Sequence, residues 1–207
     1  ITGSSSKLLS KEIAASLRGR TIAYEVFPLS FKEYLCFKGI EEEIHSTKGK
    51  AKIISAFNSY LERGGFPETI IMERELYDKT LAAYFEVMIY RDIAERHNIS
   101  NVLPLKMFIK HLMSNISKEF TIHKIFNAFK SEGLKISKDT LYKFLGYCEE
   151  AYLLLPISNF SESFSKQTIK KSYSIDTGLS RMVSFALSKD IGRLFENIIL
   201  LELKRRG

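Results

Sequence analysis

Residues 121–158 read TIHKIFNAFKSEGLKISKDTLYKFLGYCEEAYLLLPIS and carry the clearest structural pattern in the chain. They contain two runs in which apolar residues recur at helical spacing. One run follows Thr121 and the other follows Ser137, and hydroxyl residues at these positions can cap a helix start. Because a tight turn at Gly133 separates the runs, the pattern predicts a helix-turn-helix.

The segments on either side complete a larger unit. Upstream, residues 103–114 have the apolar spacing of a helix. Downstream, residues 152–160 and 169–175 are rich in β-forming residues and flank a loop with serines and lysines. Three helices followed by a β-hairpin predict a winged helix over residues 101–176.

The first 38 residues have the pattern of the end of an α/β sheet. Helical spacing over 7–18 is followed by a β-branched and aromatic segment over 21–27, which predicts a strand. Ser30 and Glu33 then form a capping box that starts another helix. Since two strands cannot shield themselves, we expect further strands of this sheet upstream.

Residues 39–100 are predicted to be a helical connector or lid. A polar loop over 39–50 leads into helical segments, which include a long helix over 76–93. After the hairpin, residues 177–207 start another unit, with a helix over 180–187 and a longer one at the end.

Composition limits the class of protein. The chain has 207 residues, 45% of them hydrophobic and 12% aromatic, which supports a packed core and argues against disorder. Its net charge of +7 favours an anionic partner without naming one. Cys36 and Cys148 lack CxxC spacing, which fits the cytoplasm, and no apolar run approaches the roughly 20 residues of a membrane span.

Two groups near the N-terminus suit nucleotide chemistry. Ser4 and Ser5 lie where an α/β sheet presents polar groups to a ligand, so a hydroxyl there could orient an attacking water. Arg18 and Arg20 could stabilise charge on a transferring phosphoryl group. The alternatives are an ordinary turn for the serines and a basic helix end for the arginines.

A third group could bind duplex DNA. Lysines on a recognition helix and a wing would contact phosphates and give salt-sensitive, weakly specific binding. Asp139, Glu149 and Glu150 on the same helix favour the alternative of a protein-docking module. The candidate lysines are Lys138 and Lys143 of the helix, with Lys135 just before it, and Lys166, Lys170 and Lys171 of the wing.

Glu196 is the one candidate metal ligand, and a single carboxylate does not hold a divalent cation. The sequence offers no assembled nucleophile, base and orienting group. It also has no glycine-rich phosphate loop ending in Lys-Ser/Thr.

Taken together, several motifs in a fixed order resemble one family. The chain is similar to prokaryotic, largely archaeal ATPases of the AAA+ superfamily that carry a winged helix and a C-terminal domain resembling PD-(D/E)XK nucleases. The motifs are Thr2-Gly3-Ser4-Ser5, Leu17-Arg18-Gly19-Arg20, Phe27 to Glu33, Gly64-Gly65-Phe66-Pro67-Glu68, Arg91-Asp92-Ile93, Lys171 to Gly178 and Gly192 to Asn197.

This resemblance implies a mixed, mainly α fold. Residues 1–38 would end a P-loop-type α/β core, 39–100 the connector, 101–176 the winged helix, and 177–207 the start of a nuclease-like α/β domain. ATP and Mg²⁺ would bind in the full-length parent, whose Walker A and B segments would lie before Ile1.

The resemblance also implies roles for the candidate residues. Ser4 and Ser5 would sense the γ-phosphate, Arg18 or Arg20 would act on nucleotide, and Glu196 would be the first acidic position of the nuclease-like core. The chain by itself is expected neither to hydrolyse ATP nor to cut DNA.

The leading hypothesis is therefore part of an ATPase whose nucleotide cycle moves the winged helix. Its expected partners are ATP, duplex DNA, and a protein partner or further copies of itself, with no membrane. The alternatives are a non-catalytic winged-helix DNA-binding protein and a protein-docking module.

Overall fold

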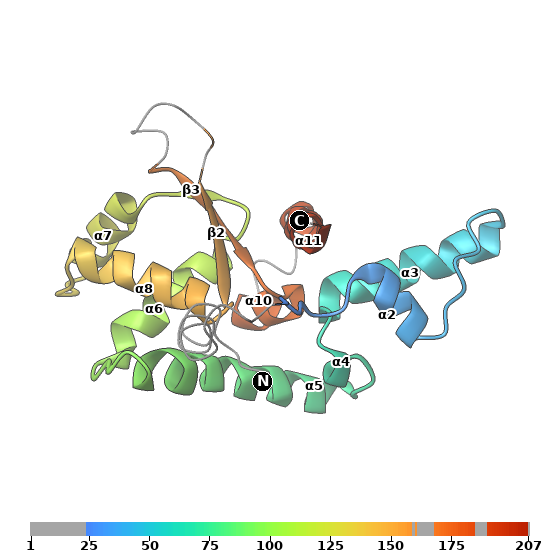
Figure 1. The fold of residues 1–207 in the computed structure, drawn as a ribbon, viewed down its shortest axis with the longest axis horizontal. Helices are drawn as coiled ribbons and strands as arrows, with labels where there is room; N and C mark the ends of the chain where they lie inside the picture. The colour runs from blue at the N-terminus through green and yellow to red at the C-terminus, as the bar shows by residue number, and fades with distance from the viewer. Residues whose placement is uncertain (1–23, 159, 161–167, 185–189, 207) are drawn as a thin grey trace, which may run out of the picture.

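The computed structural model describes residues 24–158, 160, 168–184 and 190–206 (Figure 1). These residues are mainly helical and carry one three-stranded antiparallel sheet. The mixed, mainly helical composition expected from the sequence is therefore confirmed. The helix predicted over 7–18 falls outside the described residues.

The central unit combines three helices with three short strands. Its second and third helices follow the predicted caps: the Thr121 hydroxyl accepts from the amide of Lys124 (3.2 Å), and the Ser137 hydroxyl accepts from that of Thr140 (3.0 Å). Gly133 between them has φ +82°, which favours glycine. In chain order the elements are α6 (Val102–Ser114), β1 (Glu119–Phe120), α7 (Ile122–Ser131), α8 (Lys138–Glu150), β2 (Leu154–Ser158) and β3 (Lys170–Ser174).

Strand β3 lies at the centre of the sheet, in the order β1-β3-β2, and both pairs are antiparallel. Because β1 has only two residues, it leaves one edge of β3 open near Ser174. Asn197 of helix α11 (Ile191–Arg206) fills that edge. Its side-chain oxygen accepts from the Ser174 amide (2.7 Å) and its nitrogen donates to the Ser174 carbonyl (2.9 Å), so one buried amide replaces a strand residue.

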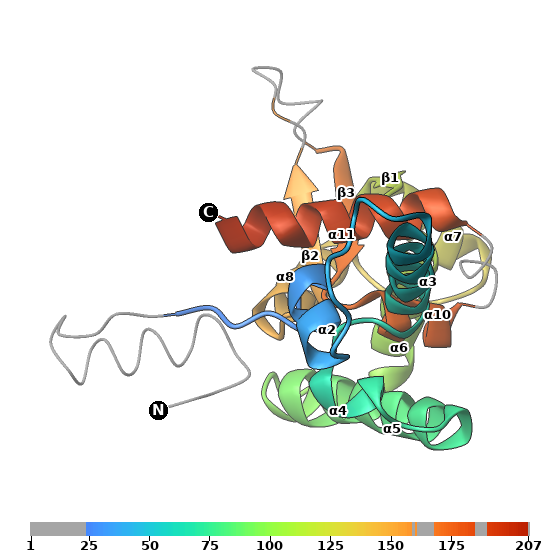
Figure 2. The same ribbon diagram turned by 90° about the vertical axis from the view of Figure 1, so that its right-hand side faces the viewer.

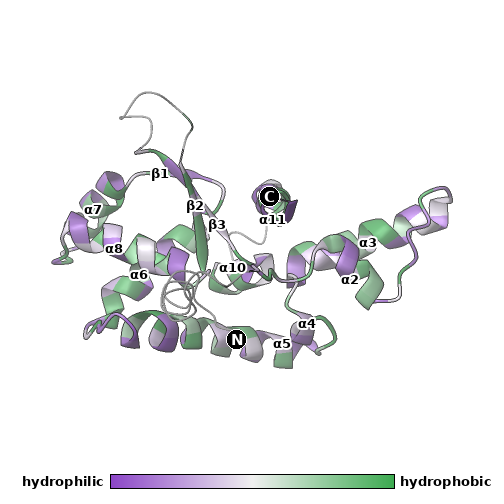
Figure 3. Ribbon diagram, in the orientation of Figure 1, coloured by the Kyte–Doolittle hydropathy of each residue, from purple (hydrophilic) through white to green (hydrophobic). Residues whose placement is uncertain are grey.

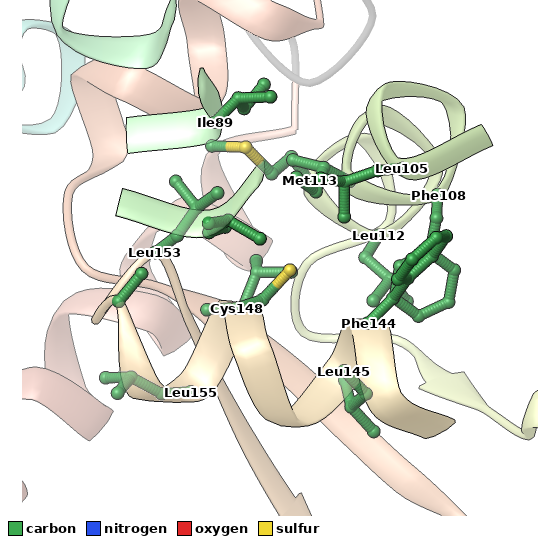
Figure 4. Packing of buried hydrophobic residues seen from close by; sticks show 14 of the residues in the cluster. Ile89, Leu105, Phe108, Leu112, Met113, Phe144, Leu145, Cys148, Leu153 and Leu155 are labelled. Carbon is green, nitrogen blue, oxygen red and sulfur yellow. The ribbon is translucent and has the colours of Figure 1, made fainter. Parts of the chain in front are cut away.

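The main hydrophobic core lies between these helices and the sheet. Figure 4 shows side chains of α6, α8 and the turn before β2 interdigitating, among them Phe108, Leu112, Cys148 and Leu153, all fully buried. Burial raises the pKa of the Cys148 thiol, which keeps it protonated and unreactive. In Figure 3 the hydrophobic residues of these elements recur along the helices, as amphipathic packing requires.

The long helix predicted over 76–93 is present and is longer at both ends. It begins as α5 (Arg74–Val87) and continues without a break as a π-helical segment, η1 (Met88–Glu95). Ile89 and Ile93 of η1 are fully buried in the main core. This end of the long helix therefore packs into the same core as α6 and α8.

A second, smaller cluster holds the helices nearer the N-terminus. Helix α2 (Phe31–Phe37) starts at the predicted capping box, in which Ser30 and Glu33 bond reciprocally. Helix α3 (Thr47–Arg63) packs against it, and the short α4 (Pro67–Ile70) follows. Figures 1 and 2 show α2 and α3 projecting from the side of the molecule opposite α7.

Three local predictions are corrected. Residues 24–27, the described part of the strand expected over 21–27, pair with no strand among the described residues. Helix α3 begins within the loop expected over 39–50, because Ser46 caps it by accepting from the Gly49 amide. Helix α10 (Thr177–Val183) begins three residues before Ser180, because the carboxylate of Asp176 provides its cap.

The carboxylate of Asp176 also joins distant parts of the chain. It accepts from the amide of Leu179 (2.9 Å) at the start of α10 and from that of Gly65 (2.7 Å), between α3 and α4. The neighbouring Gly64 has φ +77°, and a β-carbon there would overlap the carboxylate. Full burial raises the pKa of Asp176 to about 6, against the opposing effect of these backbone hydrogen bonds.

No helix in the described ranges is long and apolar enough to cross a bilayer.

Candidate nucleic-acid interface

Helix α8 presents one face to the core and the other to solvent. Leu141, Phe144, Leu145 and Cys148 form its buried face. The opposite face carries exposed side chains, including Lys143 and, at 52% exposure, Tyr142. A helix with such an exposed outer face can enter the groove of a nucleic acid, because no other described element covers that face.

Positive charge gathers at the N-terminal end of α8. Lys135 in the α7–α8 turn, Lys138 at the first position of the helix and Lys143 one and a half turns further on are all exposed. The free amides at the start of a helix add a partial positive charge at the same end. The arrangement is suited to binding phosphate groups.

A groove of about 410 Å³ runs beside this end of α8, between it and the start of α6. Lys135 and Lys143 line it together with Thr140 and Tyr147 of α8 and Asn101, the cap of α6. Two helix starts and two lysines therefore border one open hollow, whose lining is part polar and part apolar. Such a hollow can accept an anionic group that approaches from solvent.

Lys138 lies on the other side of the exposed face. Positions five residues apart on a helix differ by about 140° around its axis, so Lys138 and Lys143 flank the face rather than share it. The Lys138 ammonium lies 5.3 Å from the centroid of the Phe126 ring of α7. This cation–π contact holds the ammonium beside α7.

Of the two lysines of the predicted wing that the structure describes, one is already paired. The Lys171 ammonium is 2.9 Å from the carboxylate of Glu196 on α11, and the Tyr173 hydroxyl donates to the same oxygen (2.7 Å). Lys170 is half-buried on β3. Two residues expected to have separate roles, Lys171 in DNA binding and Glu196 in metal binding, therefore lie together as an ion pair.

The surroundings of Glu196 keep it ionised. Partial burial opposes its charge, but the hydrogen bonds from Lys171 and Tyr173 outweigh this and lower the pKa of the carboxyl. Among the described residues no three His, Cys, Asp or Glu side chains are grouped to hold a metal ion. The contacts of Glu196 with Lys171 and Tyr173 instead attach α11 to β3.

The acidic residues of α8 lie mainly at its far end. Glu149 and Glu150 close the helix, about 18 Å along the axis from Lys138. Glu150 lies 3.5 Å from the Nε2 atom of His97, whose ring stacks on Tyr147. Burial lowers the pKa of His97. Lysines therefore outnumber acidic residues at the groove end of α8, where Asp139 lies beside Lys138, and the other end, near η1, is acidic.

Ser4, Ser5, Arg18 and Arg20 fall outside the described residues, as does Lys166 of the wing. The lysines of α8 could be identified from the sequence. The pairing of Lys171 could not, because its partner lies 25 residues away on a separate helix.

Comparison with known proteins identifies a family. The chain belongs to the family described as a domain of unknown function (DUF8612), whose model matches residues 54–190. Residues 1–35 match a model described as an AAA domain. No solved structure matches the chain significantly.

Two relatives match over the whole chain. One is an uncharacterized protein of Methanocaldococcus jannaschii, which is 42% identical over 209 residues. The alignment covers 47% of the length of that protein. The other is an uncharacterized protein of Haemophilus influenzae, 31% identical over 210 residues, with 51% covered. The chain spans about half the length of these relatives.

Proposed function

We propose that this chain is part of an AAA-type ATPase and that its residues 101–176 form a winged helix that binds duplex DNA through phosphate contacts. The observation that carries the DNA-binding part is the basic end of α8, where Lys135, Lys138 and Lys143 surround the start of an outward-facing helix.

The order of elements supports the winged helix. A helix, a short strand, two helices and a hairpin follow one another, and the short strand joins the hairpin as the third strand of the sheet. In a winged helix of this topology the helix before the hairpin is the one that meets DNA. Here that helix is α8.

The ATPase part rests on the AAA match over residues 1–35 and on the resemblance of the whole chain. ATP and Mg²⁺ would be held upstream of the described residues, with Ser4 or Ser5 near the γ-phosphate and Arg18 or Arg20 acting on nucleotide. We assign no step of hydrolysis to the described residues. The role proposed for the described residues outside the DNA-binding unit is to hold and move that unit.

Residues 177–206 would begin the nuclease-like domain of the parent. The role proposed for Glu196 in this chain is to position α11, because its carboxylate is committed to Lys171 and Tyr173. A metal-binding role would require that pair to separate.

The experiment is a titration of the 207-residue chain against a labelled duplex of random sequence at low salt. Replacing Lys138 and Lys143 by alanine should weaken binding about tenfold or more, because two phosphate contacts are lost. The matched control replaces Lys48 and Lys52, exposed lysines of α3 at the opposite side of the molecule, and should leave binding unchanged.

Equal losses in both double variants would mean that only net charge matters. If the unaltered chain does not bind at low salt, the DNA proposal fails. The unit should then be assigned to protein docking, which the acidic end of α8 would suit.

A further inference from the structure

We propose that residues 25–29 form a strap that mechanically couples the AAA-matching segment of the chain to α8 and α11. The strap lies within the AAA match, just ahead of α2, and is drawn in blue in Figure 2. Its role in coupling rests on the proposed function, whereas its attachment to the rest of the molecule does not.

The beginning and the middle of the strap are held by elements that come much later in the sequence. The Tyr152 hydroxyl, in the turn after α8, donates to the carboxylate of Glu25 (2.9 Å). The Arg205 guanidinium, near the end of α11, donates to the carbonyl of Pro28 (2.6 Å) and lies 5.8 Å from the Phe27 ring centroid. These contacts bring together residues 127 and 177 positions apart.

Leu29 is the last residue of the strap, and its backbone bonds to α3 and to the α3–α4 loop. Its amide donates to the carbonyl of Gly65 (2.8 Å), and its carbonyl accepts from the Tyr60 hydroxyl (2.7 Å). Burial raises the pKa of Tyr60 to about 12, so the hydroxyl remains a donor at neutral pH. Four of the five strap residues, Glu25, Phe27, Pro28 and Leu29, are therefore contacted by α3, the α3–α4 loop, the α8–β2 turn or α11.

Tyr152 occupies an unusual position for a tyrosine. Its φ is +53°, in the left-handed region that residues other than glycine seldom adopt. The position lies just past the end of α8, where glycine commonly ends a helix. A tyrosine there is unfavourable for the backbone but places a hydroxyl on Glu25.

This geometry links the DNA-binding helix to the AAA-matching segment. Tyr152 comes two residues after the last residue of α8, so a shift of α8 along or about its axis moves the hydroxyl relative to Glu25. A pull on the strap is transmitted in the opposite direction, to α8 through Tyr152 and to α11 through Arg205. Duplex seated on α8 should therefore steady the strap.

The test follows hydrogen exchange of the Leu29 amide in the 207-residue chain. Tyr152→Phe removes one hydroxyl and Arg205→Met removes one charged donor while keeping the aliphatic stem. Each should speed exchange of this amide about five- to tenfold, because each frees one attachment of the strap. The matched controls are Tyr90→Phe and Arg206→Met, which touch no strap residue and should change it less than twofold.

Circular dichroism confirms that each variant is folded. If neither variant speeds exchange at Leu29, the proposed attachment of the strap is refuted, whether or not the chain binds DNA. If both do, duplex is added: it should slow exchange at Leu29 in the unaltered chain and not in the two variants.

Duplex that binds without changing exchange at Leu29 would overturn the coupling. A chain that binds no duplex refutes the proposed function instead, and the strap is then judged by the variants alone.

Discussion

The buried carboxylate of Asp176 should make stability depend on pH. Asp176 accepts hydrogen bonds from Gly65 and Leu179 and is fully buried where the α3–α4 loop meets the start of α10. An Asp176→Asn substitution keeps nearly the same side-chain shape and leaves the position uncharged at every pH. The difference in stability between the two proteins therefore isolates the titration of this one group.

The sign and size follow from the pKa. Burial raises the pKa of Asp176 from 3.8 to about 6, so the folded protein binds a proton more tightly than the unfolded chain does. This stabilising contribution is complete below the unfolded pKa and is lost as the pH rises through the folded one. A shift of about two pKa units corresponds to about 3 kcal/mol.

The assay is urea unfolding of both proteins at several pH values between 4 and 7, followed by circular dichroism. Relative to Asp176→Asn, the unaltered chain should lose about 2 kcal/mol of unfolding free energy over that range, because part of the total is already lost at pH 4. Tyr60 and Tyr77 nearby do not titrate there, because the ordinary tyrosine pKa of about 10 is already far above this range and burial raises the pKa of both further.

A flat difference between the proteins would contradict this reasoning. A difference of opposite slope would show that the backbone hydrogen bonds, which favour the charged form, outweigh burial.

Three further predictions concern other parts of the chain. Asn197→Ala should lower the free energy of unfolding by about 2–5 kcal/mol in urea denaturation, because it leaves two buried backbone groups of β3 without partners; a loss below about 1 kcal/mol would refute its role as a strand substitute. Gly64→Ala should destabilise by about 2–4 kcal/mol and Gly133→Ala by about 1–2 kcal/mol, since both have positive φ but only the first lacks space for a β-carbon; equal losses would argue against the close packing. If the proposed ATPase activity is found in a longer protein that contains this chain, replacing both Arg18 and Arg20 by alanine should reduce ATP hydrolysis about 10³- to 10⁵-fold and spare nucleotide binding; an unchanged rate would refute the role proposed for these arginines.

The helix-turn-helix and its caps were predictable because their signals are local. Thr121 and Ser137 each cap a helix through an amide three residues away, and Gly133 supplies the turn between them. Spacing within a dozen residues contains that information. The hairpin followed from the same kind of signal, in the composition of its two strands.

The contacts that assemble the molecule were not predictable in this way. Asp176 reads locally as part of a turn, and its bond to Gly65 spans 111 residues. The strand expected over 21–27 needed a neighbour that no local pattern can supply, and its described part pairs with no strand in the described ranges.

In the candidate site, too, the features set by local sequence were predictable and those set by tertiary packing were not. The exposure of the α8 lysines could be predicted from helical periodicity alone, since the buried positions recur every three or four residues and the lysines take other positions. The pairing of Lys171 with Glu196 depends on where α11 packs, which only the fold determines.

The most direct test of DNA binding through α8 is the salt dependence of that binding. With Lys135, Lys138, Lys143 and Lys170 as four phosphate contacts, log K should fall against log salt with a slope of about −3 to −4. Replacing Lys138 and Lys143 by alanine should reduce the slope by about two, equally for duplexes of different sequence. A slope that the double variant leaves unchanged would place the DNA elsewhere on the molecule and contradict the interface proposed for α8.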